Sequence, residues 1–130
     1  MARLRIVVAD DNPSFLRELT LLLAAEFDVV ATAADGKSAL DLIRRYKPDL
    51  VVLDLHMPAL NGIEVAGELA INPPSPPVVI CSVETDSEIV EAARQAGALG
   101  YVFKIRVHKD LILAMKSALQ GKPFVSPASH

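Results

Sequence analysis

Residues 50–54 read Leu-Val-Val-Leu-Asp, an unbroken apolar run that ends in a carboxylate. An apolar run without alternation is typical of a strand that is buried on both faces, as in a parallel sheet. Four other runs have the same β-branched or aromatic character, at residues 6–8, 29–30, 78–80 and 101–103. Between the runs lie segments with apolar residues at helical spacing. The sequence therefore predicts five repeats of a strand followed by a helix.

This alternation predicts an α/β domain with an open parallel sheet and helices on both of its faces. The chain has 130 residues, which fits one domain of ordinary size. Residues 72–77, Asn-Pro-Pro-Ser-Pro-Pro, are expected to form a stiff, extended spacer before the fourth strand. Residues 121–130 contain two prolines and no periodicity, so we expect a linker or a frayed end after a domain of residues 1–120.

Composition excludes several classes of protein. The chain has 13 Lys and Arg against 16 Asp and Glu, whereas direct binding of nucleic acid requires a basic face. No apolar run approaches the roughly 20 residues of a membrane span, and the first one ends at Asp10 and Asp11, unlike a signal peptide. The single cysteine, Cys81, excludes an internal disulfide and fits a reducing cytoplasm. We therefore expect a cytoplasmic protein that does not contact the membrane.

Polar residues follow four of the five predicted strands. Asp10 and Asp11 come after the first, Asp54 ends the third, Ser82 ends the fourth and Lys104 follows the fifth. Each alone has an ordinary explanation as a helix cap, a turn residue or a solvated charge. Together they meet at the carboxyl edge of the sheet, where such folds bind ligands. Three carboxylates repel unless a cation such as Mg²⁺ joins them, while a lysine and a hydroxyl suit a phosphoryl group.

Four motifs occur in a fixed order along the chain. They are Val-Ala-Asp-Asp-Asn at 8–12, Val-Leu-Asp-Leu-His-Met-Pro at 52–58 with Asn61-Gly62, Val-Ile-Cys-Ser at 79–82, and Gly-Ala-Leu-Gly-Tyr-Val-Phe-Lys at 97–104. In this order they resemble the receiver domain of two-component response regulators, from about residue 4 to residue 120. The resemblance implies a flavodoxin-like (βα)5 fold, a doubly wound parallel sheet with strand order 2-1-3-4-5.

The resemblance also implies a role for each acidic residue. Asp54 corresponds to the phosphoacceptor, which takes a phosphoryl group from a phosphohistidine of a sensor histidine kinase. Asp11 and Asp54 would bind Mg²⁺ directly, together with the main-chain carbonyl of His56, and Asp10 would act through water. The His56 side chain would lie at the mouth of the site and influence hydrolysis of the phosphoaspartate.

Three further positions match the phosphoryl-binding and switch residues of the family. Ser82 and Lys104 would bind the phosphoryl oxygens. Tyr101 matches the aromatic switch residue, whose ring turns inward when Ser82 moves toward the phosphate. Two positions depart from the commonest pattern, Val83 in place of a small residue and Ile105 in place of a proline. They affect the expected lifetime of the phosphorylated state and leave every required group in place.

The end of the chain suggests an output. Residues 119–127 are similar to the junction in nitrate-response regulators of the LuxR-output type, where a helix-turn-helix domain follows. The resemblance implies control of transcription through a DNA-binding domain absent from this chain. The apolar and basic stretch at residues 105–108 starts beside the face made by the fourth helix, the fifth strand and the fifth helix, so we expect this face to form a homodimer or to dock the missing output domain. The alternative is a stand-alone receiver that acts through protein–protein interaction.

Three other functions compete with this interpretation. An aspartyl-phosphate phosphohydrolase would need a second aspartate two residues after Asp54, where this sequence has His56. An interaction module independent of phosphorylation would be favoured by loss of an acidic residue or of Lys104, and all of them are present. A flavin site would need a hydroxyl-rich phosphate loop where Asp10 and Asp11 stand. We expect self-phosphorylation and self-dephosphorylation only, and no enzyme activity on an external substrate.

Overall fold

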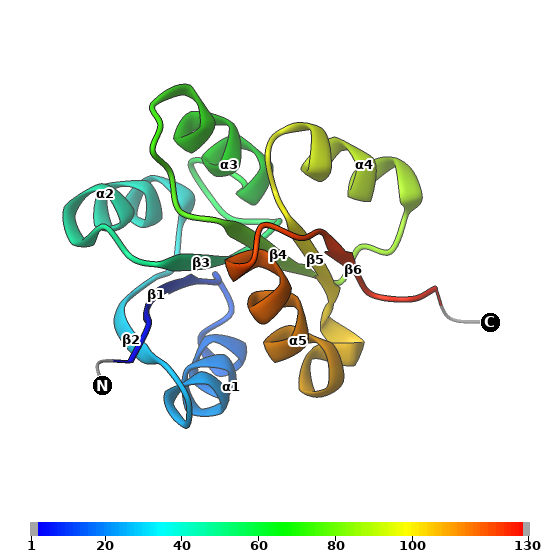
Figure 1. Cartoon of the computed structure of the whole chain (residues 1–130), viewed down its shortest axis with the longest axis horizontal. Coiled ribbons are helices and arrows are strands. Elements are labelled where there is room, and N and C mark those ends of the chain that lie inside the picture. Colours follow the sequence, from blue (N-terminus) through cyan, green and yellow to red (C-terminus); the bar gives the residue numbers. More distant parts are fainter. Residues whose placement is uncertain (1–2, 129–130) are drawn as a thin grey trace.

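The computed structural model describes residues 3–128 as one parallel sheet with helices on both faces (Figure 1). The elements are β1 (Arg5–Ala9), α1 (Pro13–Ala24), β2 (Asp28–Ala33), α2 (Gly36–Tyr46), β3 (Leu50–Asp54), α3 (Gly62–Ile71), β4 (Val78–Ser82), α4 (Ser87–Gln95), β5 (Gly100–Phe103), the 3-10 turn η1 (Lys104–Arg106), α5 (Val107–Leu119) and β6 (Phe124–Val125). The strand order is β2-β1-β3-β4-β5-β6. The predicted fold and its order 2-1-3-4-5 are confirmed, and β6 extends the sheet beyond β5.

The hydrophobic core has two layers, one on each face of the sheet. Helices α2, α3 and α4 cover one face, and α1 and α5 cover the other (Figure 1). Along β3, Val51 faces the first layer and Val52 the second, so the strand is buried on both sides as predicted. Strand β2 differs, since several of its residues are partly exposed. It lies at the edge of the sheet and pairs with β1 alone, so the apolar run at residues 29–30 is less buried than expected.

Side-chain caps fix where helices α1 and α3 begin. The Asn12 carboxamide oxygen accepts a hydrogen bond from the Phe15 N–H at 3.1 Å, and Pro13 is the first residue of α1. Asn61 and Glu64 form a reciprocal capping box at the start of α3. Helix α5 begins without a side-chain cap. The turn that precedes it must therefore be held in another way.

The end of the described chain differs from the expected linker or frayed end. Phe124 and Val125 pair with β5 as β6, and Phe124 packs against the core layer under α1 and α5. Ser126, which follows, is 2% exposed. A strand of two residues has no periodicity, and its partner is the free edge of a strand more than twenty positions away, so no local pattern predicts it. The last two residues, 129 and 130, lie outside the described part.

Residues 72–77 join α3 to β4 as a spacer, but they are not extended throughout as expected, because the chain bends at residues 72–74 and the Pro73–Pro74 peptide bond is cis. The Pro77 carbonyl accepts a hydrogen bond from the Val51 N–H at 3.0 Å. Within residues 3–128, no helix combines the length and the apolar character needed to cross a membrane.

Candidate functional site

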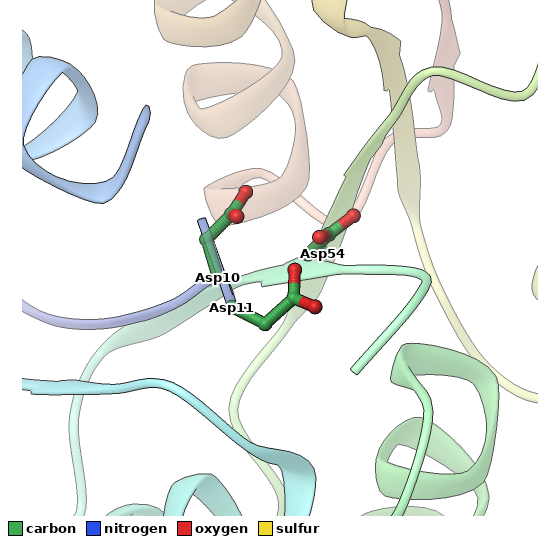
Figure 2. A group of neighbouring side chains, drawn as sticks. All are labelled: Asp10, Asp11 and Asp54. Carbon is green, nitrogen blue, oxygen red and sulfur yellow. The ribbon is translucent and has the colours of Figure 1, made fainter. Parts of the chain in front are cut away.

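Three aspartates form an acidic pocket (Asp10, Asp11 and Asp54) at the carboxyl edge of the sheet (Figure 2). Strands β1 and β3 are neighbours with Ala9 opposite Leu53, so the residues that follow them arrive side by side. One carboxylate oxygen from each aspartate lies within 4.8 Å of the others. Asp10 is 1% exposed and Asp54 5% exposed, whereas Asp11 faces solvent. Two of the three carboxylates are therefore buried, and the third is open to solvent.

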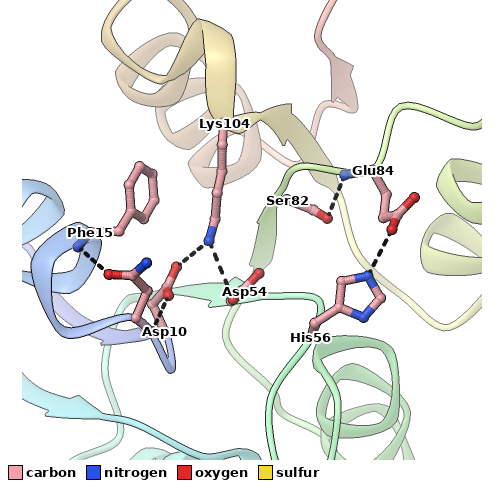
Figure 3. Close-up of polar contacts among 8 residues, drawn as sticks. Asp10, Phe15, Asp54, His56, Ser82, Glu84 and Lys104 are labelled. Atoms are coloured by element: carbon pink, nitrogen blue, oxygen red, sulfur yellow. Dashed lines mark hydrogen bonds and ion pairs between the residues drawn. The ribbon is translucent and has the colours of Figure 1, made fainter.

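Lys104 brings a cation to this pocket from the end of β5 (Figure 3). Its Nζ lies 2.8 Å from Asp10 Oδ2 and 3.4 Å from Asp54 Oδ2. The ammonium also lies 4.4 Å from the centre of the Phe15 ring, a cation–π contact. Burial lowers the pKa of Lys104, but the two carboxylates outweigh burial and hold that pKa above its ordinary value. Lys104 is therefore charged at neutral pH.

One ammonium does not balance three carboxylates. Burial, followed by repulsion from Asp10, raises the pKa of Asp54 from 3.8 to about 6, although Lys104 acts against this shift. Asp10 Oδ1 accepts a hydrogen bond from the Asn12 N–H at 2.8 Å. Asp10 Oδ2 accepts none of good geometry within residues 3–128, although it lies beside the Lys104 ammonium. Excess negative charge and a buried oxygen short of donors fit a hard divalent cation with oxygen ligands.

The second half of the site centres on Glu84, in the loop after β4 (Figure 3). Ser82 is buried, and its Oγ accepts a hydrogen bond from the Glu84 N–H at 3.0 Å. The Tyr101 hydroxyl donates to the Glu84 carbonyl at 2.9 Å, and the Tyr101 ring is buried, which raises the pKa of its phenol. His56 Nε2 lies 3.1 Å from the Glu84 carboxylate at the exposed mouth. The loop after β4 thus connects the mouth of the site to the Tyr101 ring.

The structure brings the predicted residues of four different strands to one edge. Asp10, Asp11, Asp54 and Lys104 lie in one cluster, whereas Ser82 and the His56 side chain contact Glu84. Their chemical roles stay predictions at this point.

Two site residues were not predicted from the sequence. Phe15, treated as one member of an apolar helical stripe, forms the wall beside Lys104. The signal was its place in the first turn of α1, which begins at the carboxyl edge of the sheet. Glu84 follows Ser82 by two residues, and only the turn of the loop shows that its main chain contacts both Ser82 and Tyr101.

The loop after Asp54 depends on a close backbone approach. A Cβ on Gly62 would lie 2.4 Å from the Asp54 main-chain oxygen, so only glycine allows α3 to begin there. The Gly62 N–H donates to the Leu55 carbonyl at 2.9 Å. Helix α3 therefore packs directly against the strand end that carries Asp54.

A family model for the response regulator receiver domain matches residues 6–116 of this chain. The chain belongs to this family. Receiver domains are the phosphorylated switch domains of two-component response regulators, and they interact with histidine kinases and phosphotransfer partners. They generally bind Mg²⁺ at an acidic pocket, and this receiver domain has the corresponding aspartate cluster.

Its curated relatives include several transcriptional regulators. The transcriptional regulatory protein DegU of Brevibacillus brevis is 34% identical over 127 residues, which cover 96% of this chain and 54% of DegU. The DNA-binding response regulator MtrA of Mycolicibacterium smegmatis is 37% identical over 118 residues, which cover 91% of this chain and 51% of MtrA. This receiver domain therefore spans about half the length of these relatives.

Solved structures agree with the fold and the family. A two-component response regulator of the LuxR family from Aurantimonas superposes with a TM-score of 0.91 at 32% identity, covering 97% of this chain and 91% of that one. The signal receiver domain of NarL from Mycobacterium tuberculosis superposes with a TM-score of 0.87 at 31% identity, covering 94% of this chain and all of that one.

Proposed function

We propose that Asp54 is the phosphoacceptor of this receiver domain. Support comes from its position, buried at the end of β3 beside a lysine and two further carboxylates. An Asp54 oxygen forms a bond to phosphorus while the phosphorus–nitrogen bond of a kinase phosphohistidine breaks. The electron pair of that bond leaves with the imidazole nitrogen, which binds a proton. The product is an acyl phosphate on Asp54 and a neutral histidine.

Lys104 and Ser82 are the groups that would bind the transferred phosphoryl oxygens. The Lys104 ammonium lies 3.4 Å from Asp54, so it neutralises charge that accumulates on oxygens attached there. The Ser82 hydroxyl can donate its own hydrogen to a phosphoryl oxygen while its Oγ still accepts the hydrogen bond from the Glu84 N–H. Phe15 limits where the lysine chain can swing.

The acidic pocket would hold the Mg²⁺ ion. Asp11 and Asp54 would bind it directly with the His56 main-chain carbonyl, and Asp10 would act through water. The fit rests on the three clustered carboxylates and on the Asp10 oxygen that lacks a hydrogen bond of good geometry. The ion supplies electrostatic stabilisation of the charge on the phosphoryl oxygens. The expected activity is limited to phosphorylation and dephosphorylation of the domain itself.

Tyr101 would carry the signal away from the site. Its ring is buried and its hydroxyl contacts the Glu84 carbonyl, the inward orientation expected of the active switch. When Ser82 turns toward a phosphoryl group, the Glu84 loop moves with it and the inward ring is favoured. Such a change shifts an existing equilibrium. The surface made by α4, β5 and α5 would respond to this change. It would form a homodimer or dock the output domain.

The output of this switch is proposed to be transcription, through a DNA-binding domain outside this chain. The support is that DegU and MtrA are named as transcriptional or DNA-binding regulators and are about twice as long as the matched region. A stand-alone receiver that acts by protein–protein interaction in the cytoplasm is the alternative.

Intact mass spectrometry tests the assignment of Asp54. Acetyl phosphate with Mg²⁺ should add one phosphoryl group to the parent protein and none to Asp54→Asn, because an amide is not a comparable nucleophile. Asp41→Asn is the matched control, since Asp41 is an exposed aspartate on α2. A phosphoryl group still added to Asp54→Asn, or none added to the parent and the control, would contradict the proposed function.

A further inference from the structure

The segment after α5 is built into the sheet beside the lysine of the site. Strand β6 pairs in parallel with β5, with Val125 opposite Tyr101. The Phe124 N–H donates to the Leu99 carbonyl at 3.0 Å, and the Ser126 N–H donates to the Tyr101 carbonyl at 2.9 Å. Because the two strands run in the same direction, β6 ends at the same edge of the sheet as Lys104.

At that edge, three residues form what we call the Ser126 cluster (Arg106, Asp110 and Ser126). The Ser126 Oγ accepts a hydrogen bond from the Phe103 N–H at 3.1 Å and donates one to Asp110 Oδ2 at 2.8 Å. The Arg106 guanidinium donates to the same carboxylate, with Nε 2.6 Å from Oδ2. Ser126 and Asp110 are buried, whereas the Arg106 side chain is partly exposed.

The Ser126 cluster holds both ends of the turn that carries Lys104. Phe103, the residue before Lys104, is bound through its N–H, and Arg106, the last residue of η1, is bound through its side chain. Between them Ile105 is 90% exposed, and it has no ring to fix its backbone as a proline would. Helix α5 adds no side-chain cap at this point. These contacts therefore restrict where the Lys104 backbone can lie.

We propose that Ser126 is a positioning residue for Lys104, so that docking of β6 and phosphoryl occupancy of Asp54 favour each other. The inference rests on the role proposed above for Lys104. Lys104 reaches Asp10 and Asp54 from a turn whose start and end are fixed by the Ser126 cluster. A free energy of coupling between two sites is reciprocal. If docking of β6 orders the lysine, it raises the affinity of the site for a phosphoryl group by some factor. A bound phosphoryl group must then favour docked over undocked β6 by that same factor.

The consequence is that β6, which pairs with the strand that carries Tyr101, would also respond to phosphorylation of Asp54. Phosphorylation would tighten the attachment of residues 124–128 to β5 and to the start of α5. Pro127 and Ala128 line a cavity of about 360 Å³ together with Ile105 and Arg106, so tighter docking also changes this surface. A binding partner that contacts residues 124–128 would therefore sense the state of Asp54.

Nuclear magnetic resonance of the full chain tests both halves of this proposal. Beryllofluoride with Mg²⁺ serves as the phosphoryl mimic. Ser126→Ala removes the hydroxyl, and Ser117→Ala is the matched control, because no side-chain hydrogen bond of Ser117 occurs within residues 3–128. We expect Ser126→Ala to weaken beryllofluoride binding about fivefold or more and to shift the Lys104 Nζ resonance before any ligand is added. The control should behave like the parent.

Amide exchange of the parent tests reciprocity without any substitution. Saturating beryllofluoride should slow exchange of the Ser126 N–H, because a ligand that binds more tightly when β6 is docked makes undocking of β6 less frequent. Unchanged exchange in the parent would overturn the coupling, and an unmoved Lys104 resonance in Ser126→Ala would overturn the positioning role. Binding of beryllofluoride to the parent but not to Asp54→Asn checks the proposed function separately. If the parent does not bind, the proposed function and the coupling both fail, and the Lys104 resonance still decides the positioning role.

Discussion

Asp54 and Asp110 are both buried aspartates close to the same edge of the sheet, yet their surroundings act in opposite directions. Asp54 shares one lysine with Asp10, and burial together with that neighbour raises its pKa to about 6. Asp110 has a guanidinium and the Ser126 hydroxyl to itself, and the Arg106 hydrogen bond holds its pKa below the ordinary value. A satisfied carboxylate stabilises the fold, whereas a crowded one is available to a ligand.

The largest effect on stability is expected at Asp110. Replacement by asparagine leaves Arg106 without its ion pair and places an amide NH₂ group among donors, so the free energy of unfolding should fall by about 2 kcal/mol at pH 7. Urea denaturation of the parent, Asp110→Asn and the exposed control Asp41→Asn measures the difference. Equal stability of Asp110→Asn and the parent would show that the Ser126 cluster does not support the fold.

The Arg106–Asp110 ion pair should also make stability depend on pH. Because the pKa of Asp110 is lower in the folded state, its contribution is complete above the unfolded value of about 3.8 and is lost as pH falls through the folded value. The stability difference between the parent and Asp110→Asn should therefore shrink in acid. A difference that persists unchanged in strong acid would assign the effect to packing rather than to charge.

Mg²⁺ should bind beside Asp54 and not beside Asp110. Mg²⁺ is expected to bind weakly in the acidic pocket, and Asp11→Asn or Asp54→Asn should each weaken binding by about tenfold or more, since each removes a charged ligand. In a titration followed by NMR, resonances of Asp10, Asp11 and Asp54 should shift, while those of Asp110 should not. Unchanged shifts around the acidic pocket at saturating Mg²⁺ would contradict the proposed metal site.

Asp54→Asn should fold well and gain stability at neutral pH. A carboxyl whose pKa is raised in the folded state costs stability once it ionises, so the gain should be about 1 kcal/mol above pH 6. Below pH 6 the gain should fade, and it should be absent below pH 3.8. The attraction between Lys104 and the Asp54 carboxylate is already included in this net shift, and screening by water at the exposed Asp11 side keeps the gain below what the whole shift implies. Destabilisation of Asp54→Asn at pH 7 would show that the acidic pocket is not crowded.

The sequence predicts the acidic pocket because its members share one rule of topology. Residues that follow parallel strands meet at the same edge, so the sequence alone places Asp10, Asp54 and Lys104 together. The apolar runs that define β1, β3, β4 and β5 are long enough, and buried enough, to be recognised. The prediction of burial on both faces was wrong only for β2. No local sequence pattern indicates that this strand lies at the edge of the sheet.

The Ser126 cluster could not be predicted in the same way. Ser126 and Asp110 contact each other across sixteen positions, and the strand that places Ser126 consists of two residues. Its hydrogen bonds form to a backbone N–H and to a charged side chain, groups that every sequence contains. Glu84 was missed for a similar reason, since its main chain rather than its side chain contacts Ser82 and Tyr101.

Tyr101 links the two regions, because its ring faces the Glu84 loop and its backbone pairs with β6. Tyr101→Phe removes only the hydroxyl bond to the Glu84 carbonyl, while Tyr101→Ala also removes the ring. Both variants should still accept one phosphoryl group at Asp54, because neither touches the acidic pocket. Beryllofluoride should shift resonances of α4, β5 and α5 less in Tyr101→Phe than in the parent, and least in Tyr101→Ala. Sedimentation with and without beryllofluoride shows whether a dimer follows the same order. Equal shifts in all three proteins, or an unmoved face in the parent, would mean that Tyr101 does not connect the site to this face.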